Sequence, residues 1–437
     1  MIAIVQVAGR LLWRHWPVLL AWYLGAILAR YALIEVAGYV GAYSAVAGSL
    51  LLPLAILARL IALVAMFLVL RDGMRQLNAI APLTTDPAER RREFFDALMT
   101  GILPFFAFYA AWGYLREDAD AYIARVLEVD SEMDAVATFE ESARAGDGAV
   151  GELGLTPITI AIAVAAFVLR WLWKRYRGRL PKWSGVPATY LEAVWVYYAV
   201  TVVSMALGAL NTWVSSRQAM VWLADLREVV TVGFAPLAWV WEGVEWLLGE
   251  AGGIILLPVA WLTIAGVVYG QAVAPQAVPT DELGGEIGER LRARYRSLPQ
   301  RLRARLRDIW SDVVGRFTPI GRAFVLMWRS GPVLIGGFVL LYTLLLAAQG
   351  VLGWGVTRLV GPHDLSSFWL VWDQLILLIV PVLIEPVRIA LVAGGYDAVI
   401  GRLIVRQGAT TSLANSGSNP PDSMSTTNGP DASSGTR

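Results

Sequence analysis

Apolar stretches of membrane length recur along this chain, and no other feature restricts its fold as strongly. A helix needs about 20 predominantly apolar residues to cross a bilayer. The stretch from Leu375 to Asp397 has that length, although its apolar run holds Glu385, Pro386 and Arg388. Hydrophobic residues make up 57% of the chain and charged residues only 16%. Because backbone groups in hydrocarbon must be satisfied within the chain, we predict an all-α polytopic membrane protein.

The hydropathy pattern predicts about eight transmembrane helices. They cover residues 17–39, 47–70, 101–115, 155–173, 187–210, 252–270, 331–354 and 368–392. Two further stretches, 1–16 and the Trp-rich 211–250, mix charged and apolar residues and are expected to form interfacial amphipathic helices. Beyond Gln407 the chain is rich in Ser, Thr, Asn, Gly and Pro, which predicts a disordered C-terminal tail.

A repeated motif indicates how these spans are organised. The sequence Trp-Arg-x-x-Pro-Val-Leu occurs at residues 13–19 and again at 328–334. Tryptophan and proline also recur at span ends for generic interfacial reasons, which is the rival explanation. The specific match favours four tandem helical hairpins related by an axis along the membrane normal. The hairpins are residues 1–70, 71–173, 174–271 and 331–406, with a basic amphipathic segment at 272–330 and the tail at 407–437.

The distribution of basic residues predicts the orientation in the membrane. Lysine and arginine gather at both termini and in the connections 71–98, 170–186 and 271–329, which all lie on one side of the expected topology. By the positive-inside rule, both termini are expected in the cytoplasm of a plasma-membrane protein. The connection 116–152 is strongly acidic. It is expected to face outward, where it is a candidate contact for a protein partner.

Arginines are dense from Arg290 to Arg316, immediately before the seventh expected span. Apolar residues at helical spacing lie between them over residues 302–317, which is typical of a helix on a membrane surface. We therefore expect this segment to bind anionic lipid headgroups rather than nucleic acid.

Ionisable residues within the expected spans are the candidates for a binding site. Charged groups are costly in hydrocarbon and are usually paired or functional there. Glu385 and Arg388 share one face of a helix and can pair with each other. A structural role, in which the charges hold the hairpins together, is the alternative to a substrate or proton site. The seven residues are Arg30, Glu35, Arg59, Glu192, Asp373, Glu385 and Arg388.

We predict a substrate site formed by Glu385, Arg388, Arg59 and Arg30. The prolines of the last span support this choice, because each removes a helical hydrogen bond and leaves a backbone carbonyl open to a ligand or water.

No residue pattern indicates catalysis, a metal or a cofactor. The chain has no cysteine, which excludes disulfides and thiolate chemistry. Neither His15 nor His363 has a second histidine at metal-binding spacing, and known catalytic motifs are missing. Asp118 and Asp120 are expected to lie on a solvated acidic helix. We therefore expect a protein that is not an enzyme and has no cofactor.

Among functions, the pattern favours a permease or flippase-like carrier of an amphiphilic or lipid-like compound. The first alternative is a non-catalytic membrane subunit or scaffold of a larger envelope complex. The second alternative is a lipid-modifying membrane enzyme.

Overall fold

The computed structural model describes residues 1–82, 86–111, 113–140, 157–176, 184–218, 252–273 and 331–416, with isolated residues between 179 and 249. These residues form helices and no strand. The elements are α1 (Ile2–Tyr43), α2 (Ala45–Arg71), α3 (Arg75–Ile80), α4 (Pro87–Ala111), α5 (Tyr114–Glu140), α6 (Pro157–Tyr176), α7 (Gly185–Ser215), η4 (Gly252–Leu256), α10 (Leu257–Val273), α13 (Pro332–Val360), η6 (Leu365–Trp369) and α14 (Leu370–Ser416).

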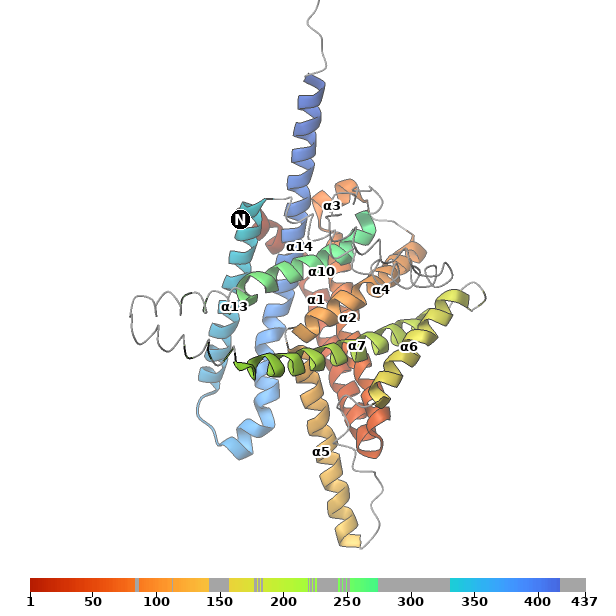
Figure 1. Ribbon diagram of the computed structural model, residues 1–437. Coiled ribbons are helices and arrows are strands. Elements are labelled where there is room, and N and C mark those ends of the chain that lie inside the picture. Colours follow the sequence, from red (N-terminus) through yellow and green to blue (C-terminus); the bar gives the residue numbers. More distant parts are fainter. Residues whose placement is uncertain are drawn as a thin grey trace, which may run out of the picture.

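Seven of these helices are long and apolar enough to cross a membrane: α1, α2, α4, α6, α7, α13 and the continuous stretch Leu365–Ile404. The chain is therefore a helical, multi-pass membrane protein. The expected sixth span coincides with η4 and α10, whose apolar helix Ile254–Gly270 is shorter than the others. Length alone does not establish that a helix crosses the membrane. In Figure 1, α7 and α10 run across the direction of α2, α5 and α14.

Two expected boundaries are wrong. The residues expected to form a separate interfacial helix, 1–16, are continuous with the first span, because α1 passes through Pro17 without interruption. Leu11 and Leu19 are buried on either side of Pro17, so packing holds the helix together there. At the other end α14 continues to Ser416, beyond the expected start of the tail at 407. Most of 211–250 and of 272–330, and all of 417–437, lie outside the described residues.

The first and last expected hairpins are packed helix pairs. α1 lies against α2 and also against α14, and α13 lies against α14. The turn between α1 and α2 is tight because Ser44 adopts an extended conformation and its hydroxyl caps α2. Glycines let the two helices meet closely: a Cβ on Gly48 would lie 2.5 Å from the Cα of Gly41.

The two middle hairpins are paired differently from the expectation. α6 packs against α7, and α4 packs against α10, α7 and α2. The connection from α6 to α7 is short, which favours neighbouring antiparallel helices, whereas a long acidic segment separates α4 from α6. An ion pair between Arg170 and Glu192, and a 3.1 Å hydrogen bond from Trp173 Nε1 to Ser184 Oγ, join α6 to α7.

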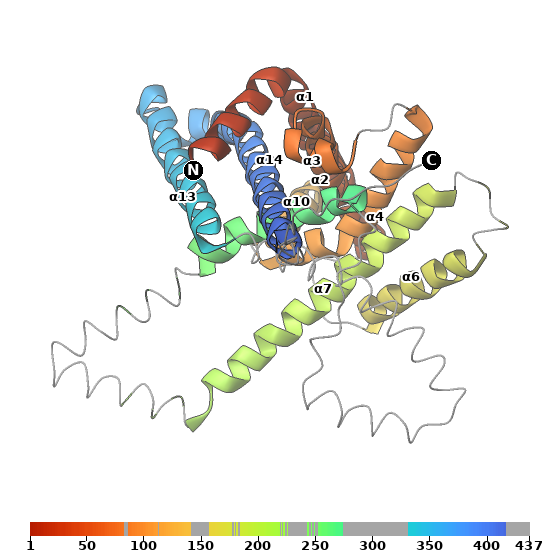
Figure 2. The same cartoon turned by 90° about the horizontal axis from the view of Figure 1, so that it is seen from above.

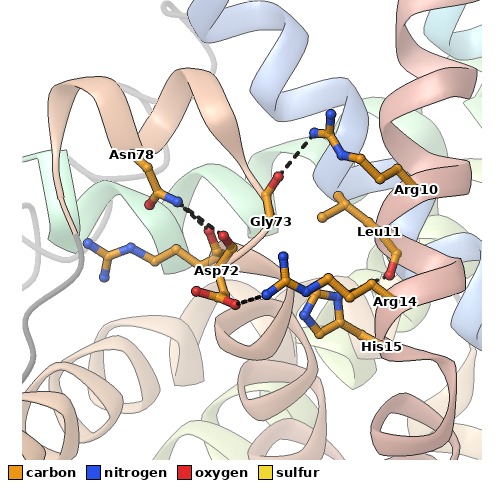
Figure 3. A network of polar contacts seen from close by, with 8 residues as sticks. Arg10, Leu11, Arg14, His15, Asp72, Gly73 and Asn78 are labelled. Carbon is orange, nitrogen blue, oxygen red and sulfur yellow. Dashed lines mark hydrogen bonds and ion pairs between the residues drawn. The ribbon is translucent and has the colours of Figure 1, made fainter.

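A polar network fastens the first half of α1 to the connection between α2 and α3 (Figure 3). Arg10 donates to the carbonyl of Gly73 at 3.1 Å, and Arg14 lies 3.3 Å from the carboxylate of Asp72. The Asp397 carboxylate of α14 accepts from the backbone N–H of Leu77 at 3.0 Å, at the start of α3. α14 thereby holds α3, and α1 holds the connection that precedes it.

The acidic connection is described as far as residue 140, where it forms the helix α5, and one face of this helix is buried rather than solvated as expected. α5 packs against α1 and α4, and its residues Tyr122, Val126 and Val129 are buried at helical spacing. Glu35 of α1 lies 2.7 Å from Arg125 of α5. Asp118 is on the same face and is also fully buried, so the expectation that it is solvated is wrong. Other acidic residues of α5 are exposed, among them Glu117, Asp120, Glu132 and Asp134.

The turn before η6 is capped by the carboxylate of Asp364. Asp364 Oδ1 accepts hydrogen bonds from the backbone N–H of Ser367 at 2.8 Å and of Ser366 at 3.0 Å. These bonds and the two serine hydroxyls lower the pKa of Asp364 from 3.8 to about 2. A lowered pKa means that the cap stabilises the turn above pH 3.8 and is lost as the pH falls toward 2.

Hydrogen exchange at residues 365–369, corrected for its intrinsic pH dependence, should therefore accelerate as the pH falls from 3.8 toward 2. An Asp364→Ala variant should show fast exchange throughout, and an identical transition in that variant would contradict this assignment.

Candidate functional site

The four residues expected to form a substrate site meet in one cavity. Arg30, Arg59, Glu385 and Arg388 all line a cavity of about 280 Å³. Its walls come from α1, α2, α4, α5, α10, α13 and α14, so the site depends on contacts between helices that are distant in sequence.

The remaining wall of the cavity is mainly aromatic and aliphatic. α10 contributes an apolar side that includes Trp261, and α2 contributes small and aliphatic residues next to Arg59. Such a wall combines stacking surfaces with few polar groups, which suits a ligand that is partly apolar. The aromatic lining residues are Tyr23, Phe105, Phe108, Tyr109, Tyr114 and Trp261.

A buried carboxylate organises one end of the cavity. Asp118 of α5 has no exposed surface, and its Oδ1 accepts from Arg30 Nε at 2.6 Å. Its Oδ2 accepts from the hydroxyl of Tyr109 at 2.5 Å. Tyr109 in turn accepts from Arg59 Nη1 at 2.6 Å. Asp118 therefore holds two helices in place and compensates Arg30 directly.

Arg59 is bound differently from the other two arginines of the site. Its guanidinium lies 5.5 Å from the ring centre of Tyr109 and 5.4 Å from that of Tyr114. No carboxylate of the described residues forms an ion pair with it, and Asp118 reaches it only through the Tyr109 hydroxyl. Aromatic faces and a phenol stabilise a cation less than a carboxylate does. Arg59 is partly buried and lines the cavity.

The expected local pair is present at the other end of the cavity. Arg388 forms an ion pair with Glu385 one turn away on α14. It also donates from Nη2 to Gln349 Oε1 of α13 at 2.7 Å, and its guanidinium lies 5.9 Å from the ring centre of Trp261. Only 4% of Arg388 is exposed. Its partners come from α10, α13 and α14, so three helices hold this cation.

Among the residues that the structure describes, the charges around the cavity do not cancel. Three guanidinium groups, those of Arg30, Arg59 and Arg388, face two carboxylates, Asp118 and Glu385. An excess positive charge in a site of low dielectric constant costs free energy unless a counterion is bound. The arrangement can therefore bind an anionic group, with aromatic rings beside it.

The other ionisable residues of the expected spans do not line this cavity. Glu35 pairs with Arg125, and Glu192 pairs with Arg170. Asp373 accepts at 2.6 Å from the N–H of Gln374, its neighbour in the chain. His15 bonds the carbonyl of Leu11 within α1. Within the described ranges, no group of three His, Cys, Asp or Glu side chains could hold a metal ion.

Sequence reasoning missed Asp118, Tyr109 and Gln349, which hold the candidate arginines. A signal for Asp118 was present, because it lies one helical turn before Tyr122 and thus on the apolar face that continues through Val126. For Tyr109 and Gln349 no local signal exists, because their partners are 50 and 39 residues away.

Comparisons with protein-family models, with curated protein sequences and with solved structures found no match.

Proposed function

We propose that this chain is a plasma-membrane carrier, of the permease or flippase-like kind, for an anionic amphiphile. The observation that carries the proposal is Arg59, which lines a cavity with excess positive charge and has no carboxylate partner among the described residues. An anionic headgroup would compensate this charge, and the aromatic wall would contact the apolar part of the same molecule.

The proposed orientation has both termini in the cytoplasm. The asymmetry of lysine and arginine supports it. The arrangement of the helices is consistent with it, because α1 begins and α14 ends near one end of the molecule while α5 extends from the other (Figure 1). In this orientation α5, with its many carboxylates, lies on the outer side and could contact a protein partner there.

Arg59→Gln should weaken the binding of phosphatidate by roughly tenfold to a hundredfold, because it removes charge-assisted hydrogen bonds to the phosphate. Binding is measured by native mass spectrometry of the purified protein in a neutral detergent. In proteoliposomes of phosphatidylcholine, the same variant should lose the transbilayer movement of a fluorescent phosphatidate that the unmodified protein supports. Arg59→Lys keeps the charge and should retain part of both activities.

Arg116→Gln is the matched control, since it makes the same change on the exposed side of α5, where the arginine side chain is 87% exposed. It should leave binding and movement unchanged. Equal phosphatidate binding by the Arg59→Gln and unmodified proteins would contradict the proposed site. Binding without transbilayer movement in the unmodified protein would contradict a carrier and favour a membrane scaffold subunit.

A further inference from the structure

A groove lies between the second half of α13 and the first part of α14, next to the cavity. It has a volume of about 490 Å³ and is mostly apolar. α13 and α14 are neighbouring helices in both views, with α14 between α13 and the rest of the bundle (Figures 1 and 2). The lining residues are Leu346, Gln349, Gly350 and Gly353 of α13, with Leu377, Val380 and Pro381 of α14.

The groove and the cavity are adjacent. Gln349 and Pro381 line both of them. Gln349 is also the residue that accepts a hydrogen bond from Arg388. The inner end of the groove therefore lies beside the charged part of the cavity.

The groove is open to the surface at an apolar residue. Leu377, which lines it, is 51% exposed. Both α13 and α14 are among the helices long enough to cross a membrane. Hydrocarbon chains of the bilayer are therefore the medium that this surface contacts.

Two glycines keep the groove open. A Cβ added to Gly350 or Gly353 would meet no atom within 4 Å, so packing does not require glycine at either position. Both lie inside α13, where glycine is a poorer helix former than alanine. Their effect is to leave space along one side of the helix.

We infer that this groove binds the acyl chain of the same anionic amphiphile whose charged group lies at Arg59. The inference rests on the proposed function. A chain in the groove leads from the bilayer to Gln349, and from there the cavity continues to the guanidinium groups. A transmembrane helix of a partner is about 10 Å wide, so it could cover the groove but could not follow it inward. The substrate class is thus an amphiphile with at least one long acyl chain that enters from the side of the bundle.

Gly353→Leu and Gly350→Leu should each weaken the binding of oleoyl lysophosphatidate by roughly tenfold, because a leucine side chain displaces methylene groups of the ligand. The probe has one phosphate and one acyl chain, and native mass spectrometry in neutral detergent measures its binding. Gly355→Leu is the matched control on the same helix: its Cβ also meets nothing within 4 Å, but Gly355 does not line the groove. It should bind as the unmodified protein does.

Arg59→Gln, measured beside these variants, separates the two ideas. Weak binding by Arg59→Gln with normal binding by both groove variants would overturn the acyl-chain inference and leave the proposed site intact. Normal binding by Arg59→Gln would overturn the proposed site and the inference together. A groove variant that changes the oligomeric state in light scattering, while lysophosphatidate binding stays normal, would identify the groove as a helix-packing surface instead.

Discussion

Asp118→Asn should lower the free energy of unfolding by about 3–5 kcal/mol, the cost of leaving a buried charge without its partner. Asp118 is fully buried, and it accepts hydrogen bonds from Arg30 and from Tyr109. Asparagine keeps the shape but removes the charge that compensates Arg30. Unfolding in mixed micelles with increasing dodecyl sulfate gives the free energy for comparison with the unmodified protein.

The matched control is Asp120→Asn in the same helix, since the Asp120 side chain is 68% exposed and lies 3.8 Å from the exposed Arg116. Its effect should be within about 0.5 kcal/mol. Adding Arg30→Met to Asp118→Asn removes the unpaired cation and should recover a large part of the loss. Equal effects of the Asp118 and Asp120 variants would show that Asp118 is solvated, contrary to the structure.

Glu385→Gln should cost about 2–4 kcal/mol of stability, because it leaves the buried guanidinium of Arg388 without a carboxylate. The glutamine can still accept one hydrogen bond, and Gln349 remains in place, so the cost is below that expected for Asp118. Thermal unfolding of the purified variants measures the difference. The exposed Glu117 supplies the control, and Glu117→Gln should melt as the unmodified protein does.

A second substitution tests whether the pair is structural. Adding Arg388→Met to Glu385→Gln removes both charges and should restore much of the stability. If Glu385→Gln instead melts normally but shifts the pH dependence of phosphatidate movement, the carboxylate is a proton or ligand site, and the structural assignment is wrong.

Local patterns were sufficient to predict much of this molecule. Apolar runs predicted the helical membrane protein, and the spacing of Glu385 and Arg388 predicted their pairing, because neighbours on one helix face do not depend on the rest of the fold. The rule that charges in hydrocarbon need partners selected Arg30 and Arg59, which line the same cavity as the other two. That rule cannot identify the partner.

Local sequence patterns did not predict the contacts between segments that are distant in the chain. Asp118 is one of many acidic residues in its segment, and its burial follows from the packing of α5 on α1, which brings it to Arg30 across 88 residues of sequence. The tandem order of spans likewise did not predict that α6 lies against α7. Helix pairing in a membrane is decided by small residues, polar contacts and connection lengths rather than by the order of apolar runs.

Two prolines divide α14 into halves that differ in how deeply they are buried. Pro381 and Pro386 donate no backbone hydrogen bond, so the carbonyls of Leu377 and Val382 lack their usual helical partners. After them, residues 389–400 are almost entirely buried, whereas before them most residues of α14 are exposed. Helices bend at such positions. The half of α14 after the prolines is thus packed in the bundle, whereas the half before them lines the groove and is largely exposed. We expect a bend of α14 at the prolines to change the width of the groove while Arg388 stays in place.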